Sequence, residues 1–237
     1  MSAMDKEFSR YSRQIFMEEV SIEGQRKIGN SRVLVIGAGG LGSPVLQYLA
    51  AAGVGNLAVI DFDLLEIHNL NRQIIHQEAF IGQPKVESAA SFVQQLNSRI
   101  SFTPINEKLT TDNIENILSE YDIIVDGSDN FETRYLVNDH CIKMGKTLVY
   151  GSIFSFEGQV AVFNYEGSKN LRDIFPSPPN PEDVQNCDQF GVLGALAGIT
   201  GTMMAMLTLK VILGINVPIN QLTIIDSKNW NFNQLRY

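Results

Sequence analysis

The most constraining feature of this sequence is a glycine-rich motif, GAGGLG at residues 37–42, that joins an apolar strand to a helix. The residues VLVI precede it directly, and a helical pattern follows as far as Gly53. Glycine lets the backbone approach a phosphate closely, and the start of the helix offers N–H groups and the positive end of a dipole. The predicted phosphate-binding glycines are Gly37, Gly39, Gly40 and Gly42.

An acidic residue stands at the position where a nucleotide's ribose is usually held. Asp61 comes 19 residues after Gly42, at the end of the next apolar strand. The glycine motif and this acid together predict a nucleotide site. They suit NAD and ATP equally, so the choice between the two depends on residues further along the chain.

Strands and helices alternate through the first 150 residues, which favours an α/β fold with a mostly parallel sheet and helices on both faces. We expect two later strands to extend this sheet as antiparallel neighbours. The expected strands are 32–36, 57–61, 101–106, 123–125, 147–151, 158–164 and 222–226. The expected helices are an N-terminal arm at 8–30, a helix ending at 53, and helices at 86–97, 111–119 and 132–144, with Asp112 capping the helix at 111–119.

The length of 237 residues fits a single domain, with an N-terminal arm at 1–30 and a mobile crossover loop at about 167–189. Residues 192–209 carry no charge over 18 positions. This stretch is either a transmembrane span or a helix buried in the core or in a subunit interface. Its glycines and threonines lower its hydrophobicity and favour the buried helix.

The composition is that of an ordinary globular protein, with 44% hydrophobic and 19% charged residues. The net charge of -8 argues against a nucleic-acid partner or an anionic membrane. The polar N-terminus does not resemble a signal peptide. Two cysteines, Cys141 and Cys187, lie far apart without a CxxC pair, which suits the cytoplasm, and we expect Cys141 to be buried in its helix.

A second set of polar residues follows Asp61, in HNLNRQ at 68–73 and QPK at 83–85. A triphosphate carries more negative charge than the pyrophosphate of NAD and therefore needs cations. Arg72 and Lys85 would supply two, with Asn69 and Gln73 as additional donors. The alternative is an exposed polar loop that binds nothing.

A third set lies at the end of the strand DIIVD, where the chain reads DGSDN at 126–130. The carboxyl end of such a strand lies near the ligand crevice of a doubly wound sheet. Mg²⁺ takes one or two carboxylates together with phosphate oxygens and waters, so Asp129 is the candidate metal ligand. The alternative is that Asp129 caps the following helix. His68, His76 and His140 are expected to be structural.

Eight segments together carry a family resemblance: RYSRQI at 10–15, VLVIGAGGLGSP at 33–44, AAGVGNLAVIDFD at 51–63, NLNRQIIH at 69–76, GQPKVESA at 82–89, DGSDN at 126–130, EGQVAVF at 157–163 and NCDQFGVLG at 186–194. In this order they resemble the ThiF/MoeB/HesA family, bacterial relatives of ubiquitin-activating enzymes. The resemblance runs from about residue 8 almost to the end of the chain. The last segment is more similar to ThiF than to MoeB.

The resemblance implies a Rossmann-like sheet in a homodimer that uses ATP and Mg²⁺. Members adenylate the C-terminal glycine of a small β-grasp sulfur-carrier protein ending in Gly-Gly, and a sulfur donor acts afterwards. Asp61 resembles the ribose ligand, with Asp63 beside it in the nucleotide site, and Asp129 resembles the Mg²⁺-linked aspartate. Arg13 resembles an arginine that reaches into the partner subunit's site. The residues that resemble triphosphate contacts are Asn69, Arg72, Gln73 and Lys85.

The sequence departs from the family at its zinc site, which commonly uses two CxxC pairs. No such pair is present, so no zinc is expected. Cys187 matches a cysteine that in ThiF-like proteins joins the carrier's C-terminus through an acyl disulfide, and the alternative is an ordinary loop cysteine.

Two other classes remain as alternatives, an NAD-dependent oxidoreductase and a non-catalytic binding subunit. Within the family, RYSRQI and NCDQFGV favour a ThiF-like role in thiamin thiazole synthesis over a MoeB-like role in molybdopterin synthesis.

Overall fold

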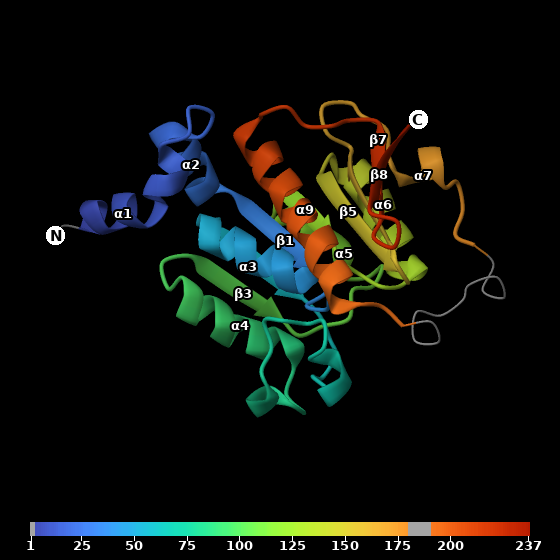
Figure 1. Ribbon diagram of the computed structural model, residues 1–237, viewed down its shortest axis with the longest axis horizontal. Coiled ribbons are helices and arrows are strands. Elements are labelled where there is room, and N and C mark those ends of the chain that lie inside the picture. Colours follow the sequence, from blue (N-terminus) through green and yellow to red (C-terminus); the bar gives the residue numbers. More distant parts are fainter. Residues whose placement is uncertain (1–2, 180–190) are drawn as a thin grey trace.

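A single eight-stranded sheet forms the centre of the molecule (Figure 1). The computed structural model describes residues 3–179 and 191–237 of the chain. The strand order is β3-β2-β1-β4-β5-β6-β7-β8, parallel from β3 to β5 and antiparallel from β5 to β8. The predicted α/β class, a mostly parallel sheet extended by antiparallel strands, is confirmed. The strands are β1 (Arg32–Ile36), β2 (Asn56–Ile60), β3 (Ser101–Ile105), β4 (Ile123–Asp126), β5 (Thr147–Phe154), β6 (Glu157–Phe163), β7 (Gln221–Asp226) and β8 (Asn231–Arg236).

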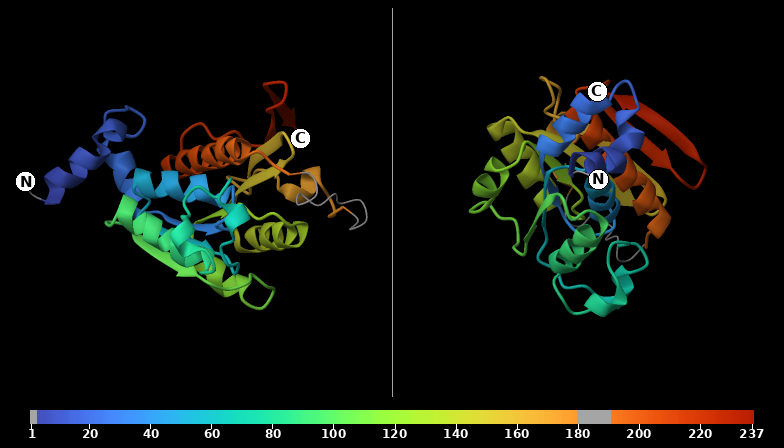
Figure 2. Two further views of the ribbon diagram at one scale, coloured as in Figure 1. Left: turned by 60° about the horizontal axis from the view of Figure 1, so that its bottom comes forward. Right: turned by 90° about the vertical axis from the view of Figure 1, so that its left-hand side faces the viewer.

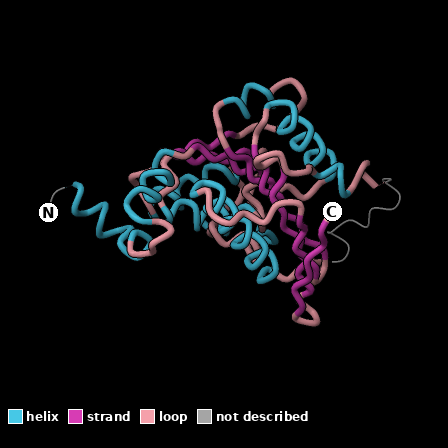
Figure 3. Tube along the Cα trace, turned by 90° about the horizontal axis from the view of Figure 1, so that it is seen from above, coloured by secondary structure: helices cyan, strands magenta, loops and turns pink. Residues whose placement is uncertain are grey.

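Helices cover both faces of this sheet (Figures 2 and 3). One face carries α3 (Gly42–Ala52), α4 (Lys85–Leu96) and α9 (Gly194–Leu213), and the other carries α5 (Ile114–Ser119), α6 (Phe131–Met144) and the short α7 (Leu171–Ile174). Alternate residues of β1 divide between the two resulting cores, Val33 and Val35 on the α9 side and Leu34 and Ile36 on the α6 side. A strand buried on both faces reads as a continuous apolar run, which explains the sequence VLVI.

The uncharged segment near residue 200 is a helix of the core. Helix α9 crosses one face of the sheet, with its first residue against Asn71 and its last against Gly24 of α2 (Ser21–Asn30). It is long and apolar enough to span a membrane, but 56% of its most apolar window is buried inside the molecule. Tight contacts explain two of its glycines: an added Cβ would come within 2.5 Å of the Asn71 carbonyl oxygen at Gly194 and of the Leu41 carbonyl oxygen at Gly201. The buried-helix interpretation is therefore the one that the fold supports.

Three details differ from the expectations drawn from the sequence. The N-terminal arm is two helices, α1 (Ala3–Ile15) and α2, because Ser21 has a φ of +54°, which a continuous right-handed helix excludes. Asp112 does not cap α5. That helix begins at Ile114 with Asn113 in the cap position, and the Asn113 side chain accepts a hydrogen bond from the Thr110 N–H at 2.8 Å. Strand β8 was not predicted, because its six residues are all exposed and show no apolar alternation.

Candidate nucleotide site

The glycine loop and the end of β4 meet at the middle of the sheet. Strand β1 continues into α3 on one face, and β4 continues into α6 on the other, so the strand order changes direction between them, and the carboxyl ends at this switch point are where the ligand crevice of an open α/β sheet lies. Gly127 donates a hydrogen bond to the Ile36 carbonyl at 3.0 Å. A Cβ on Gly37 would stand 3.2 Å from the Gly127 carbonyl oxygen, and Gly37 has a φ of +89°. The two loops that the sequence singled out are thus in contact.

The glycines of the loop differ in how closely other atoms approach them. A Cβ on Gly42 would overlap the Gly37 carbonyl oxygen, so Gly42 is required by the tightness of the turn itself. Gly40 lies against Arg72, whose Cγ would be 3.6 Å from an added Cβ. Gly39 is more open, and its nearest neighbour is the Gln73 Nε2 at 3.7 Å. The segment around residue 72 therefore lies directly beside the glycine loop.

Ala38 is held from both sides. Its N–H donates to the Asp61 Oδ2 at 2.8 Å, and its carbonyl accepts a hydrogen bond from the His76 Nε2 at 2.8 Å. His76 is buried, and its Nδ1 lies 2.9 Å from the Ser88 hydroxyl. Since a carbonyl can only accept, the ring carries its proton on Nε2. His76, predicted to be structural, orients the glycine loop.

Asp61 lies at the end of β2 and faces the loop. Its Oδ2 binds the Ala38 N–H and its Oδ1 accepts from the Asp63 N–H at 2.8 Å. Burial raises the pKa of Asp61, while these backbone hydrogen bonds and the nearby Lys85 charge act in the opposite direction. A carboxylate accepts about four hydrogen bonds, so Asp61 retains capacity for ribose hydroxyls.

Lys85 opens α4 and points back to Asp63. Its Nζ lies 2.7 Å from the Asp63 Oδ2, and only 8% of the lysine side chain is exposed, against 50% for the aspartate. The backbone repeats the contact, because the Lys85 N–H donates to the Asp63 carbonyl at 3.0 Å. The predicted cation thus lies near Asp61 and is already paired with Asp63.

The segment from residue 66 to 76 presents three of the predicted contacts. Asn69 and Gln73 are buried, and Arg72 is half-buried. The Asn69 carbonyl accepts from the N–H groups of Arg72 and Gln73, at 3.1 and 2.9 Å, which folds the segment into a compact turn. The Arg72 Nη1 donates to the His68 carbonyl at 3.1 Å. The Gln73 Oε1 is buried without a hydrogen-bond partner among the described residues.

The loop after β4 contains residues that the sequence did not single out. Asp126 is fully buried, and its Oδ1 accepts from the Ser128 N–H at 2.9 Å. Arg134, on α6, donates to the Ser128 carbonyl at 2.7 Å and to the Tyr150 hydroxyl at 2.9 Å. Burial raises the pKa of Asp126, and the Arg134 charge opposes this. The only signal in the sequence was that Asp126 and Ser128 belong to the segment DGSDN.

Asp129 does not cap α6. The cap is Asn130, whose Oδ1 accepts from the Thr133 N–H at 2.9 Å. Asp129 is exposed after the end of β4, and its Oδ1 accepts a hydrogen bond from the Asn130 amide at 3.4 Å. The capping alternative is therefore wrong, and the carboxylate is available for other contacts.

The residues at this crevice fit a nucleotide with Mg²⁺. Two buried atoms beside the loops, Gln73 Oε1 and Asp126 Oδ2, lack a hydrogen-bond partner in the described part of the chain, which points to a ligand or to water. Within residues 3–179 and 191–237, no group of three or more His, Cys, Asp or Glu side chains is arranged to bind a metal. Mg²⁺ needs no such group, since phosphate oxygens and waters complete its shell.

Two predicted residues lie elsewhere. Arg13 is exposed on α1, near Tyr11, whose hydroxyl accepts a hydrogen bond from the Asn97 side chain at the end of α4. Figure 1 shows α1 far from the start of α9, so Arg13 cannot complete the site of its own chain. Cys187 lies outside the described residues. Cys141 is buried in α6, as expected, and burial raises the pKa of its thiol.

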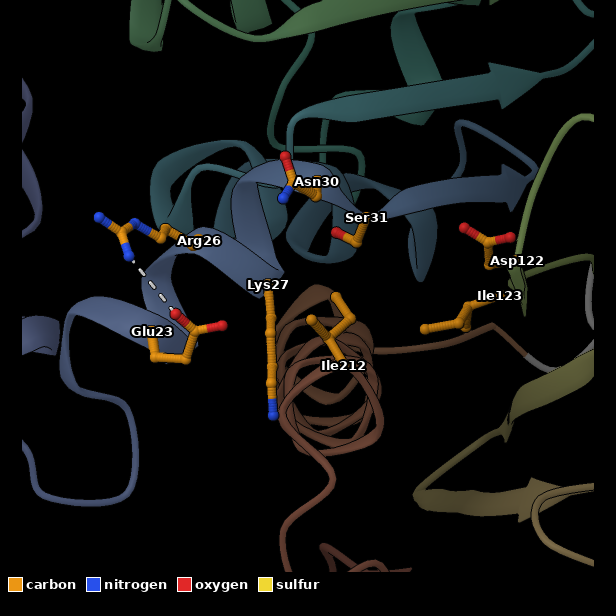
Figure 4. Close-up of a pocket in the computed structure, with 8 residues that line it drawn as sticks. All are labelled: Glu23, Arg26, Lys27, Asn30, Ser31, Asp122, Ile123 and Ile212. Carbon is orange, nitrogen blue, oxygen red and sulfur yellow. Dashed lines mark ion pairs between the residues drawn. The ribbon is translucent and has the colours of Figure 1, made fainter.

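A surface pocket of about 390 Å³ lies at the other end of the central strands, where β4 begins (Figure 4). Asp122 and Ile123 at the start of β4, Ile212 of α9 and residues of α2 line it. Two of the lining residues, Glu23 and Arg26, form an ion pair at 3.5 Å. Ligands of open α/β sheets bind at the carboxyl ends of the strands, and this pocket is at the amino ends, so it is separate from the glycine loop.

The fold and the crevice define an α/β protein of the Rossmann-like class. The ThiF family profile matches residues 11–237, and the chain belongs to the ThiF family. Solved structures agree on the fold. The microcin C7 biosynthetic enzyme MccB, in complex with N-formylated MccA, superposes with a TM-score of 0.84 at 21% identity, covering 100% of this chain and 74% of that one. Escherichia coli MccB with ATP gives 0.82 at 22% identity, covering 96% and 70%.

Relatives of known name are closer in sequence. The adenylyltransferase and sulfurtransferase MOCS3 of Culex quinquefasciatus is 45% identical over 233 residues, which is 98% of this chain and 53% of that protein. The sulfur carrier protein adenylyltransferase of Thermus thermophilus is 43% identical over 236 residues, 97% of this chain and 87% of the relative. The chain thus spans about half the length of the MOCS3 relatives.

Proposed function

We propose that this protein is an adenylyltransferase that uses ATP and Mg²⁺ to activate the C-terminal carboxylate of a small sulfur-carrier protein. The observation that carries the proposal is the direct contact of the glycine loop with Arg72, Gln73 and Asp61, and of Asp63 with Lys85. Four separated segments of the sequence converge there on one crevice. The names of the MOCS3 and Thermus thermophilus relatives support the same activity.

The proposed chemistry is a substitution at phosphorus. A carboxylate oxygen of the carrier's terminal glycine attacks the α-phosphorus, the bond to the bridging oxygen breaks, and pyrophosphate leaves with the electron pair. The carboxylate is already ionised at neutral pH, so no protein base is needed. Positioning and neutralisation of phosphate charge then account for catalysis. Arg72 and Lys85 would neutralise the phosphates, and Asp129 would hold the Mg²⁺.

Cations also distinguish ATP from NAD. The pyrophosphate of a dinucleotide is largely bound by the glycine loop and helix start, whereas a triphosphate needs further positive charge. Lys85, buried beside Asp63, and Arg72, beside Gly40, supply that charge at the loop. An oxidoreductase has no evident use for them.

Three finer points complete the proposal. The carrier would belong to thiamin thiazole synthesis, as the segments RYSRQI and NCDQFGV suggest, with molybdopterin synthesis as the alternative. The active form would be a homodimer in the cytoplasm, in which Arg13 serves the partner's site. No zinc would be required, because the two cysteines of the sequence cannot form a four-thiolate site.

Exchange of labelled pyrophosphate into ATP tests this function. We expect exchange that depends on Mg²⁺ and on a carrier protein ending in Gly-Gly. Thermal unfolding with ATP or NAD⁺ provides a parallel test, because a specific ligand raises the Tm. Stabilisation by NAD⁺ alone would favour the oxidoreductase, and stabilisation by ATP without exchange would indicate a non-catalytic binding subunit.

A further inference from the structure

Lys85 and Asp63 form an ion pair in which the lysine is buried. Lys85 is a buried cation, and Asp63 contacts it directly with Nζ and Oδ2 2.7 Å apart. A buried charge is expensive unless it is paired, so the lysine needs an anion whenever phosphate is absent. A triphosphate that contacts Lys85 brings its own negative charge to the position that the Asp63 carboxylate already occupies.

The backbone fixes this pair before any ligand arrives. The Asp63 N–H is held by Asp61, and the Asp63 carbonyl accepts the Lys85 N–H. Next to them, the Leu65 N–H donates to the Gln83 carbonyl at 2.9 Å, and the Gly82 N–H donates to the Leu65 carbonyl at 2.8 Å. Residues 63–65 and 82–85 thus form a short ladder that sets the two side chains face to face.

Among residues 3–179 and 191–237, Asp63 forms the one ion pair of the Lys85 ammonium group. His76 lies near Lys85, and burial together with this positive charge lowers the pKa of the ring, so the ring does not compete with Lys85 as a cation at neutral pH. Asp61 also feels the Lys85 charge, but its oxygens accept hydrogen bonds from the Ala38 and Asp63 N–H groups, and the ion pair that Lys85 forms in the described part of the chain is with Asp63. Asp63 is the acid in direct contact.

We propose that Asp63 is the counter-ion of Lys85 in the nucleotide-free protein and competes with the triphosphate for it, so that Asp63 lowers the affinity for phosphate while it stabilises the empty site. Asp63 is then a positioning residue, which acts through Lys85, and not a ligand of the ribose. The inference rests on the proposed function, because it assumes that a triphosphate binds at Lys85.

The substitution Asp63→Asn separates charge from geometry. Asparagine has the same size, and its Oδ1 can still accept a hydrogen bond from the Lys85 Nζ. Without the carboxylate charge, the empty protein should unfold at a Tm lower by roughly 5–10 °C. Inorganic tripolyphosphate, titrated calorimetrically without Mg²⁺, should bind about tenfold more tightly than to the wild type, since its competitor is gone.

Two further variants serve as controls. Glu87→Gln removes one negative charge from the exposed first turn of the same helix and should change tripolyphosphate affinity less than about twofold. In a Lys85→Met background, Asp63→Asn should no longer tighten binding, because the lysine for which the two anions compete is gone.

The outcomes distinguish this inference from the proposed function. If the wild type binds neither tripolyphosphate nor Mg²⁺–ATP, the proposed function fails and this inference with it. If the wild type binds both but Asp63→Asn binds tripolyphosphate equally or more weakly, only the competition is overturned. A loss of affinity confined to experiments with Mg²⁺ would also overturn it and would make Asp63 a metal ligand.

Discussion

The Nε2–H of His76 donates a hydrogen bond to the carbonyl oxygen of Ala38 at 2.8 Å. It joins the polar segment after β2 to the glycine loop before α3, two segments whose own sequences say nothing about each other. The opposite side of Ala38 is held by Asp61, so the peptide units of the loop are fixed in orientation. A loop fixed in this way presents its N–H groups to a phosphate without having to reorganise.

This contact predicts a pH dependence of stability. Burial, together with the Lys85 charge, lowers the pKa of His76, so the unfolded chain takes up a proton more readily than the folded one. The ring is neutral in both states well above pH 6.5 and contributes no dependence there. Below that value stability falls with pH, by at most about 1.4 kcal/mol per pH unit from this group. Urea unfolding of the wild type and of His76→Gln would be measured from about pH 7 down to about pH 5, the range in which histidine titrates. The free energy of unfolding should fall more steeply for the wild type. Exposed His68, substituted by Gln, provides the control, and equal slopes for all three proteins would refute the prediction.

Two glycines of α9 should respond oppositely to the same substitution. A Cβ on Gly198 meets nothing within 4 Å, so Gly198→Ala should stabilise the protein by up to about 1 kcal/mol through helix propensity. A Cβ on Gly201 would press on the Leu41 carbonyl oxygen and the Pro44 ring, so Gly201→Ala should destabilise it by about 1–2 kcal/mol. Urea midpoints measure both. Equal changes in stability for the two substitutions would contradict the close contact between Gly201 and the Leu41 carbonyl oxygen.

Adjacent residues at the start of α6 should separate catalysis from stability. Asp129→Ala should reduce pyrophosphate exchange by roughly a hundredfold or more and leave the Tm nearly unchanged, because Asn130 caps the helix. Asn130→Ala should instead cost about 1 kcal/mol of stability. A large loss of stability in Asp129→Ala, or full exchange activity, would contradict the assignment of this carboxylate to Mg²⁺.

The position of Arg13 predicts complementation between subunits. Arg13 lies on α1, which Figure 1 shows far from the start of α9, so we expect any role of Arg13 in the reaction to be at the site of a second chain. Arg13→Ala and Arg72→Ala should each be inactive alone. After random exchange of equal amounts, roughly half of the dimers contain one chain of each variant, and one of the two sites in each of these is intact. The mixture should therefore recover roughly a quarter of the wild-type rate. No recovery after subunit exchange, or a monomer by light scattering, would reject the shared site.

Cys187 should act only after adenylation. Cys187→Ala should keep pyrophosphate exchange and reduce sulfur transfer to the carrier, with the wild type forming an adduct detectable by mass spectrometry. Cys141→Ser is a poor control, because Cys141 is buried and its substitution can disturb the fold. Alkylation of the native protein with iodoacetamide serves better, and we expect it to modify Cys187 and not Cys141. Wild-type transfer by Cys187→Ala would favour the MoeB-like alternative.

The sequence alone predicted those parts of the site that depend on neighbours along the chain. The glycine loop, the strand before it and Asp61 follow from local constraints: Gly42 is required by a turn closing on Gly37, and the apolar run VLVI by a strand buried on both faces. The alternation of elements determined the α/β class and the parallel sheet. Strand β8 escaped prediction because it is exposed on both faces and carries no apolar period.

Only the tertiary structure decided which polar residues serve which partner. Nothing in the spacing of Asp63 and Lys85 shows that they form an ion pair, or that Asp126 is buried beneath the β4 loop. The local pattern allowed Asp129 to be a helix cap, and the hydrogen bond of Asn130 excludes it. These contacts join residues distant in sequence, and their free energies come from burial, which depends on how the helices pack on the sheet. Local sequence therefore determined where a nucleotide can approach, and packing determined the charge that it meets there.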